Sequence, residues 1–171
     1  MKKYIILTIM LLGISLTASA QKYALIDMEY ILKNIPAYER ANEQLEQSSK
    51  KWQSEVDKLS EEAKTLYKNY QSEAAFLSAE QKQKREDAIV AKEKEAAELR
   101  RKYFGNDGEL FKKQQSLMQP IQDEIYNAVK EVSEQRGYAM VIDRASAASI
   151  IFASPSIDIS NEILAKLGYS N

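Results

Sequence analysis

The groups that could do chemistry in this sequence are carboxylates, amines, guanidinium groups, phenols and hydroxyls, because it contains no histidine and no cysteine. The usual general bases, thiolate nucleophiles and transition-metal ligands are therefore missing. Paired carboxylates could still cleave glycosides, but the 25 Asp and Glu residues are spread along charged stretches, which is typical of a solvated helix surface. The inventory predicts a protein that is not an enzyme and that uses no metal and no cofactor.

The remaining candidates for function are aromatic side chains and one basic cluster. Aromatic residues that lie off the apolar face of an exposed helix either contact a binding partner or pack on the flank of a neighbouring helix. Tyr67, Phe104 and Phe111 lie off this face, whereas Tyr70 and Tyr103 fit it. The full set of candidate contact residues, with one aliphatic member, is Tyr67, Tyr70, Phe76, Leu77, Tyr103, Phe104 and Phe111. The best basic patch is Arg100, Arg101 and Lys102. Surface contact and structural packing both stay open for the aromatic set.

The first twenty residues have the three-part layout of a secretory signal peptide. Lys2 and Lys3 precede a short apolar run, which ends at the small-x-small site Ala18-Ser19-Ala20. The run is short for a membrane anchor, the competing interpretation, which needs about 20 apolar residues. We expect cleavage before Gln21 and an exported chain. Without Lys2 and Lys3 the chain has 22 basic and 25 acidic residues, and this balance argues against a nucleic-acid partner.

Long helices in the middle of the chain must position the aromatic side chains. Residues 37–104 contain no glycine or proline and are rich in good helix formers. Apolar or small residues recur there at steps of three and four, as in a coiled-coil seam. The outgoing seam is Tyr38, Ala41, Leu45, Ser48, Trp52, Val56, Leu59, Ala63, Leu66, Tyr70, Ala74 and Leu77. The returning seam is Ile89, Ala96, Leu99, Tyr103, Leu110, Leu117, Ile121, Ile125, Ala128 and Val132. Ser78 and Gln81 fit a capping box, which places the hairpin tip near Leu77 and Ser78.

Two features could interrupt the returning helix, the stretch Gly105–Gly108 and Pro120. We expect a bent but continuous helix, because the apolar spacing stays in phase from Tyr103 to Leu110 and Leu117. A true turn at residues 105–108 is the competing interpretation. Because several seam residues are small, the arm should bury little apolar area and bend easily.

Short β-like stretches flank these long helices. Strands are predicted at Lys22–Asp27 and Tyr138–Asp143, and a third at Ile150–Phe152. A short last helix should be capped by Asp158 or Ser160 and end at Gly168. The predicted class is α+β, dominated by a long coiled-coil hairpin. Residues 21–36 and 120–171 form a strand-built body, and residues 37–119 form the arm. So few strands do not make a stable sheet alone, which favours an oligomer.

Four stretches carry a family resemblance. Residues 22–38, 77–81, 128–143 and 158–164 resemble, in this order, the opening strand and helix, the hairpin tip, the closing helix and strand, and the final helix of Skp (OmpH-like) periplasmic chaperones. The similarity extends over essentially the whole chain after the signal peptide.

The resemblance implies a homotrimer whose short strands form a shared β-body, with three hairpins that enclose a cavity. It implies an ATP-independent holdase that binds unfolded outer-membrane β-barrel proteins in the periplasm. The alternative is an envelope scaffold or spacer without a client cavity. The implied trimer-body residues are Tyr23, Leu25, Ile26, Met140, Val141, Ile142, Ile150 and Ile151. Some family members are strongly basic, whereas this chain is slightly acidic, so lipopolysaccharide binding is not predicted.

Overall fold

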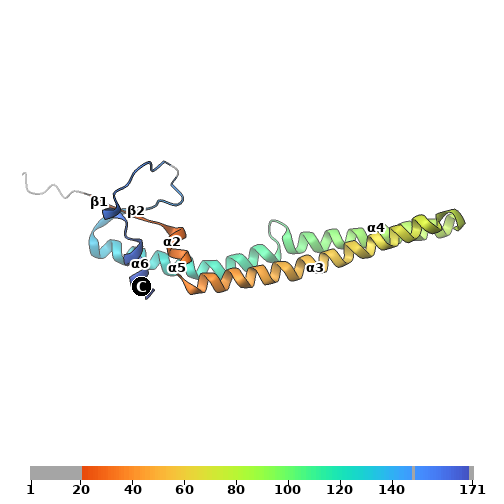
Figure 1. Ribbon diagram of the computed structural model, residues 1–171, viewed down its shortest axis with the longest axis horizontal. Helices are drawn as coiled ribbons and strands as arrows, with labels where there is room; N and C mark the ends of the chain where they lie inside the picture. The colour runs from red at the N-terminus through yellow and green to blue at the C-terminus, as the bar shows by residue number, and fades with distance from the viewer. Residues whose placement is uncertain (1–20, 148, 170–171) are drawn as a thin grey trace, which may run out of the picture. The chain divides into compact units, whose positions relative to one another are not determined.

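The computed structural model describes residues 21–147 and 149–169 (Figure 1). The predicted signal peptide lies outside these residues. The described chain divides into two compact units. The arm unit is residues 35–124, and the body unit consists of the described parts of residues 1–34 and 125–171. In the described part of the chain, no helix is long and apolar enough to cross a membrane.

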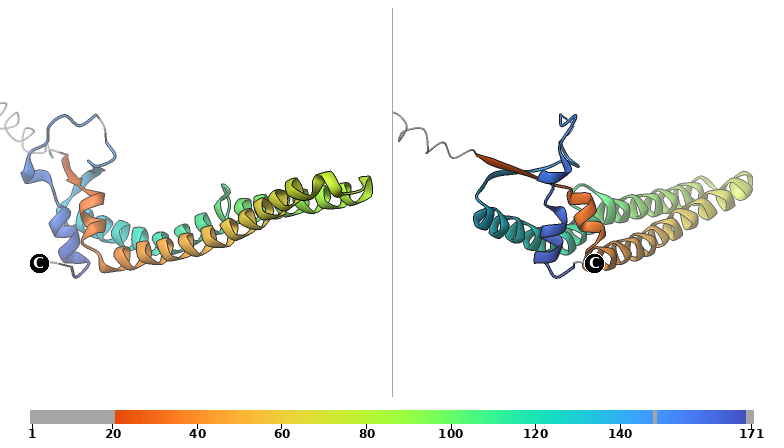
Figure 2. Two further views of the ribbon diagram at one scale, coloured as in Figure 1. Left: turned by 45° about the vertical axis from the view of Figure 1, so that its right-hand side comes forward. Right: turned by 60° about the vertical axis from the view of Figure 1, so that its left-hand side comes forward.

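The arm is built on two antiparallel helices that lie side by side in every view (Figures 1 and 2). Helix α3 (Pro36–Glu73) begins with proline at its first turn, where the missing N–H costs nothing. Its 38 residues span roughly 57 Å. The short helix η1 (Ala74–Phe76) and an extended Leu77 reverse the chain. Helix α4 (Ala79–Phe104) then starts with the predicted capping box of Ser78 and Gln81, which is confirmed.

The predicted seam is confirmed along the hairpin. Every outgoing and returning seam position is buried or half-buried, and Ala41, Val56 and Ala63 are almost fully covered on α3. Ile89 and Ala96 are their counterparts on α4. Between them Lys92 is bonded to Glu62 of α3 and to Glu95 of its own helix, at 3.4 and 2.7 Å. Small side chains and a charged layer leave the hairpin a thin core.

The prediction of a continuous helix through residues 105–108 is wrong, and the competing turn is correct. Helix α4 ends at Phe104, and helix α5 (Glu109–Arg136) begins after Gly108. The Gly108 N–H donates to the Gly105 carbonyl at 2.9 Å, which closes the turn. A Cβ on Gly105 would lie 2.4 Å from the Arg101 carbonyl oxygen, and one on Gly108 would lie 2.7 Å from that of Tyr103. Only glycine fits both places.

The apolar spacing was misleading here because the turn keeps the seam in phase. Tyr103 before it and Leu110 after it are both half-buried, as the continuous-helix interpretation required. The second expected interruption is milder, since α5 continues through Pro120 to Arg136. Helix α5 supplies residues to both units, with the division after Glu124.

The body contains the two predicted strands, which are confirmed. Strand β1 (Lys22–Ile26) pairs in parallel with β2 (Tyr138–Asp143), with Leu25 opposite Ile142. Helix α5 ends at Arg136, and the next residue, Gly137, turns the chain into β2 with a φ of 70°. Helix α2 (Met28–Lys33) and helix α6 (Ser160–Lys166) complete the unit. Its core includes Ala24, Leu25, Ile26, Ile31, Ile125, Ile163 and Leu164.

The prediction of a third strand at residues 150–152 is wrong. This segment has no regular structure, and Ile151 is fully exposed. The second edge of β1 is partly taken by the following segment, because the Ile159 N–H donates to the Leu25 carbonyl at 2.9 Å. Within the residues that the structure describes, Ile150–Phe152 pairs with neither strand, because apolar β-branched residues alone do not make a strand.

The last helix ends as predicted, but its N-cap position is Ile159, which has no side-chain cap, so neither Asp158 nor Ser160 is the predicted cap. The Asp158 carboxylate accepts from the backbone N–H of Ser160 at 2.9 Å, just before the first turn, and the single-turn helix η2 (Pro155–Ile157) precedes it. Gly168 ends the helix with a φ of 83°. Its N–H bonds to the Ala165 carbonyl, and that of Tyr169 bonds to the Leu164 carbonyl, which is a Schellman motif.

Candidate functional site

Three of the predicted aromatic contacts are surface groups of the arm. Phe76 at the hairpin turn is 88% exposed, and Tyr67 on α3 and Phe111 on α5 are about half exposed. Leu77, next to Phe76, is half-buried in the turn. A phenyl ring as exposed as that of Phe76 contributes little to the fold. These side chains are therefore available to another polypeptide.

Tyr103 and Phe104 belong to a structural cluster instead. The Tyr103 ring stacks on Trp52 of α3, with 5.0 Å between centroids and 11° between planes. Its hydroxyl donates to the Glu55 carboxylate, which raises the pKa of Tyr103, with partial burial as a further cause. Phe104 meets the Tyr103 ring edge-on at 6.4 Å. The cluster fixes the end of α4 against α3 directly before the turn.

Tyr70 is likewise engaged within the hairpin. Its hydroxyl donates to Glu86 across the two helices, and this hydrogen bond raises the pKa of Tyr70. One turn further toward the tip, Arg85 is bonded to Glu73 at 3.0 Å. Tyr70 therefore joins α3 to α4 near the outer end of the hairpin.

Tyr67 lies beside a shallow groove between α3 and α4. The groove has a volume of about 460 Å³. It is lined by Ser60, Ala63, Lys64, Tyr67, Glu93, Ala96, Ala97 and Arg100. Small side chains form its floor, because the facing seam residues Ala63 and Ala96 fill little space. The structure thus brings Tyr67 together with one member of the predicted basic patch.

The predicted basic patch does not act as one cluster. Arg100 lines the groove, whereas the Lys102 ammonium lies 5.6 Å from the centre of the Tyr103 ring. Arg101 is exposed in the last turn of α4. Two of the three cations therefore face different neighbours.

Two exposed apolar side chains of the long helices α4 and α5 were missed. Val90 on α4 is 61% exposed in the arm, and Tyr126 on α5 is 68% exposed in the body unit. Each directly follows a buried seam residue, Ile89 or Ile125. The seam phase therefore carried the signal for both, since a helical residue next to a seam position faces away from it.

The predicted trimer-body residues fall into two groups. Leu25 and Ile26 are buried within one chain, and Val141, Ile142 and Ile150 are half-buried. In contrast, Tyr23 and Met140 are about half exposed, and Ile151 is fully exposed next to the 84% exposed Phe152. The second group forms part of the apolar surface of the body unit.

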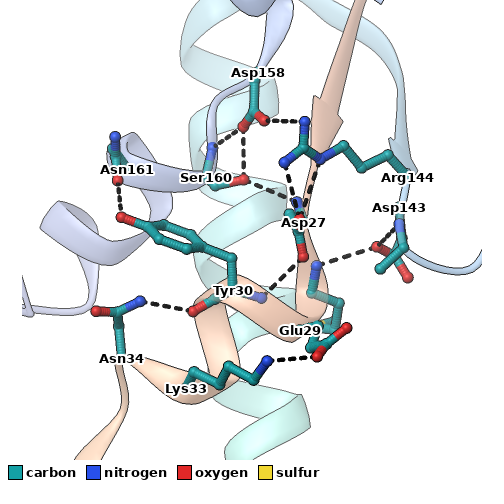
Figure 3. A network of polar contacts seen from close by, with 12 residues as sticks. Asp27, Glu29, Tyr30, Lys33, Asn34, Asp143, Arg144, Asp158, Ser160 and Asn161 are labelled. Carbon is teal, nitrogen blue, oxygen red and sulfur yellow. Dashed lines mark hydrogen bonds and ion pairs between the residues drawn. The ribbon is translucent and has the colours of Figure 1, made fainter. Parts of the chain in front are cut away.

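A polar network holds the base of the loop that carries Ile151 and Phe152 (Figure 3). At one end of this loop the Arg144 guanidinium pairs with Asp27 at 3.0 Å and with Asp158, at the other end, at 3.5 Å. The Asp27 N–H donates to the Ser160 hydroxyl at 2.8 Å, and that hydroxyl donates to Asp158 at 2.6 Å. These contacts connect the end of β1, the end of β2 and the start of α6.

Two aspartates of this region, Asp27 and Asp143, have lowered pKa values. The Asp27 carboxylate caps α2 by accepting from the Tyr30 N–H, and this bond and the Arg144 guanidinium lower the pKa of Asp27 despite partial burial. Burial raises the pKa of Asp143, but hydrogen bonds from the N–H of Met28 and from Ser146 outweigh it, so the pKa is lowered overall. Ion pairs and hydrogen bonds thus fix the two ends of this loop to each other.

The fold and the exposed apolar side chains together define the class of protein. The protein has a two-helix hairpin, inserted in sequence between two parallel strands of a small body, with exposed apolar side chains on both units. The OmpH-like outer membrane protein family model matches residues 22–167, and the chain belongs to this family.

Known relatives agree with that assignment. The chaperone protein Skp of Yersinia enterocolitica is 28% identical over 157 residues, which cover 90% of this chain and 92% of the relative. The Skp of Pectobacterium atrosepticum is 26% identical, with the same coverage. An OmpH-like crystal structure from Caulobacter crescentus CB15 has a TM-score of 0.68 at 11% identity, covering 87% of this chain and 85% of that one, and so shares the fold.

Proposed function

We propose that this protein is an ATP-independent holdase that binds unfolded outer-membrane proteins in the periplasm and prevents their aggregation. The observation that carries the proposal is the exposure of large aromatic side chains on the arm, namely Tyr67, Phe76 and Phe111. Membership of the OmpH-like family and the Skp relatives support it. The absence of histidine and cysteine favours a binding role over catalysis.

The mechanism rests on many weak contacts. Unfolded barrel precursors expose alternating apolar strands that aggregate with one another. Separate aromatic anchors at Tyr67, Phe76 and Phe111 engage different parts of such a chain, and their summed contacts hold it without any single strong bond. Release then needs no nucleotide, because folding into the membrane buries the apolar face of the client. A thin, charged hairpin seam lets the arm adapt to clients of variable shape.

Assembly into a trimer is part of the proposal. A two-stranded sheet is marginal by itself, and β2 offers an outer edge with Met140 exposed on it. The exposed Ile151 and Phe152 add apolar surface on a loop whose base is fixed by Arg144. Covering these groups with further copies of the chain stabilises the small body. Native mass should therefore be three times that of one chain, and a monomeric mass contradicts this part.

The function is tested by light scattering of a denatured outer-membrane barrel diluted into buffer. The native protein should suppress aggregation at one trimer per client. The variant Tyr67→Ser, Phe76→Ser, Phe111→Ser should suppress it much less at equal helicity. A matched control replaces exposed neighbours on the same elements, Asn69→Ser, Ala75→Ser and Gln115→Ser.

Three outcomes separate the possibilities. Loss of suppression in the aromatic variant alone supports the proposed contacts. Equal loss in the control variant, or no loss in either, contradicts the role of the aromatic residues. If the native protein does not suppress aggregation, the envelope scaffold is the better interpretation.

A further inference from the structure

We propose that Gln21 is modified to pyroglutamate once it is the first residue of the exported chain. The inference rests on the proposed export and goes beyond it, because cleavage alone leaves a free amine. Gln21 directly follows the small-x-small site Ala18-Ser19-Ala20. In the structure it is an exposed residue immediately before β1, outside the strand pairing. Its side chain is therefore not required by the sheet.

The reaction is balanced within one residue. The α-amino nitrogen of Gln21 attacks its own Cδ, and a new N–Cδ bond closes a five-membered lactam. The Cδ–Nε2 bond breaks, and Nε2 leaves as ammonia with the proton that the amine gives up. No oxidant, metal or cofactor takes part. Because nucleophile and carbonyl belong to the same side chain, their effective concentration is high without a separate binding site.

Tyr23 is the residue that positions the Gln21 side-chain amide. Its hydroxyl donates to the Oε1 atom of Gln21 at 2.7 Å. That oxygen gains negative charge when the amine adds to Cδ, and a hydrogen-bond donor stabilises such charge. The leaving Nε2 has no hydrogen-bond partner among residues 21–147 and 149–169. Because Tyr23 is half exposed, water competes for the same oxygen, and the acceleration is modest.

The modification protects the first strand. β1 has five residues and supplies one of the two strands of the sheet. An aminopeptidase needs a free α-amine, and removal of the first residues would take away the pairs Lys22–Tyr138 and Tyr23–Met140. A lactam at residue 21 blocks that attack. It also removes a positive charge beside Lys22, whose ammonium lies 3.4 Å from the Arg136 carbonyl oxygen.

The test is the intact mass of the exported protein, produced from the full-length sequence and measured at once without digestion. The expected mass is that of residues 21–171 less one ammonia. The unreduced mass of residues 21–171, unchanged after days at neutral pH, overturns cyclisation while export stands. A mass that starts at another residue, or that retains residues 1–20, overturns cyclisation together with the proposed cleavage.

Two variants sharpen the result. Gln21→Ser has no side-chain amide, so it can neither close the lactam nor lose ammonia at this position. Tyr23→Phe should cyclise roughly two- to tenfold more slowly, the range expected for one exposed hydrogen bond. The rate is followed by mass after a removable N-terminal tag is cut to expose residue 21. Wild-type speed in Tyr23→Phe, at an unchanged circular-dichroism spectrum, removes the positioning role.

Discussion

Replacing Gly105 and Gly108 by alanine distinguishes a turn from a helix by the sign of the stability change. In a continuous helix each Gly→Ala change stabilises by about 1 kcal/mol. In the observed turn an added Cβ at Gly108 would lie 2.7 Å from the Tyr103 oxygen and 2.9 Å from the Gly105 nitrogen. These are backbone atoms, which cannot rotate away. Overpacking of this kind costs about 1–3 kcal/mol at each site.

The assay is urea unfolding followed by far-ultraviolet circular dichroism, which reports helix content. Protein concentration is held constant because assembly shifts apparent stability. Asn106→Ala is the matched control, since Asn106 is exposed in the same turn and should change stability by less than about 0.5 kcal/mol. Both glycine variants should unfold at lower urea. If either is more stable than the native protein, the turn is not the folded conformation and the steric reasoning fails.

Three further predictions concern single contacts. Ser78→Ala removes the N-cap of α4 and should cost about 0.5–2 kcal/mol in the same assay, and no loss would contradict the capping box. The pKa of Asp27 is lower in the folded protein than its ordinary value of 3.8. The ionised carboxylate therefore stabilises the fold at pH values above 3.8, and this contribution is lost as the pH falls through the pKa of the folded state. Asp27→Asn can still cap α2 but cannot form an ion pair with Arg144. It should lower the free energy of unfolding at pH 7 and make that free energy fall less steeply in acid. A dependence of stability on pH equal to that of the native protein contradicts this. Ile151→Ser with Phe152→Ser should lower the native mass in light scattering at unchanged helicity, and a retained mass excludes the loop from assembly.

Much of the arm could be predicted because helix periodicity is a local signal. A seam from Tyr38 to Leu77 needs only side-chain spacing, and the Ser78–Gln81 cap needs only four neighbouring residues. The turn at Gly105–Gly108 could not be predicted from this spacing, because the apolar residues before and after the turn stay in phase with one another. Its glycines were visible, but the close approach of the Arg101 carbonyl oxygen was not.

Predictions that depended on distant partners succeeded less often. Ile150–Phe152 has strand-like composition, yet Asp158 and Ile159 take the available part of β1. Sequence spacing placed Tyr103 in the seam, but it gave no sign of the Trp52 stack or of the bond to Glu55. Such contacts join residues far apart in the chain, and a single sequence does not reveal them.

The pairing of β1 with β2 has a consequence for how the chain folds. Lys22 lies opposite Tyr138, so the intervening chain must return before the sheet can form. Closing so long a loop is entropically costly and slows folding when no local structure forms first. The hairpin supplies that structure, because its contacts propagate from Ser78 outward between residues that are close in sequence. We therefore expect the hairpin tip to set the order of folding: a substitution that slows helix pairing there should delay pairing of the strands, even though the final sheet contains none of the altered residues.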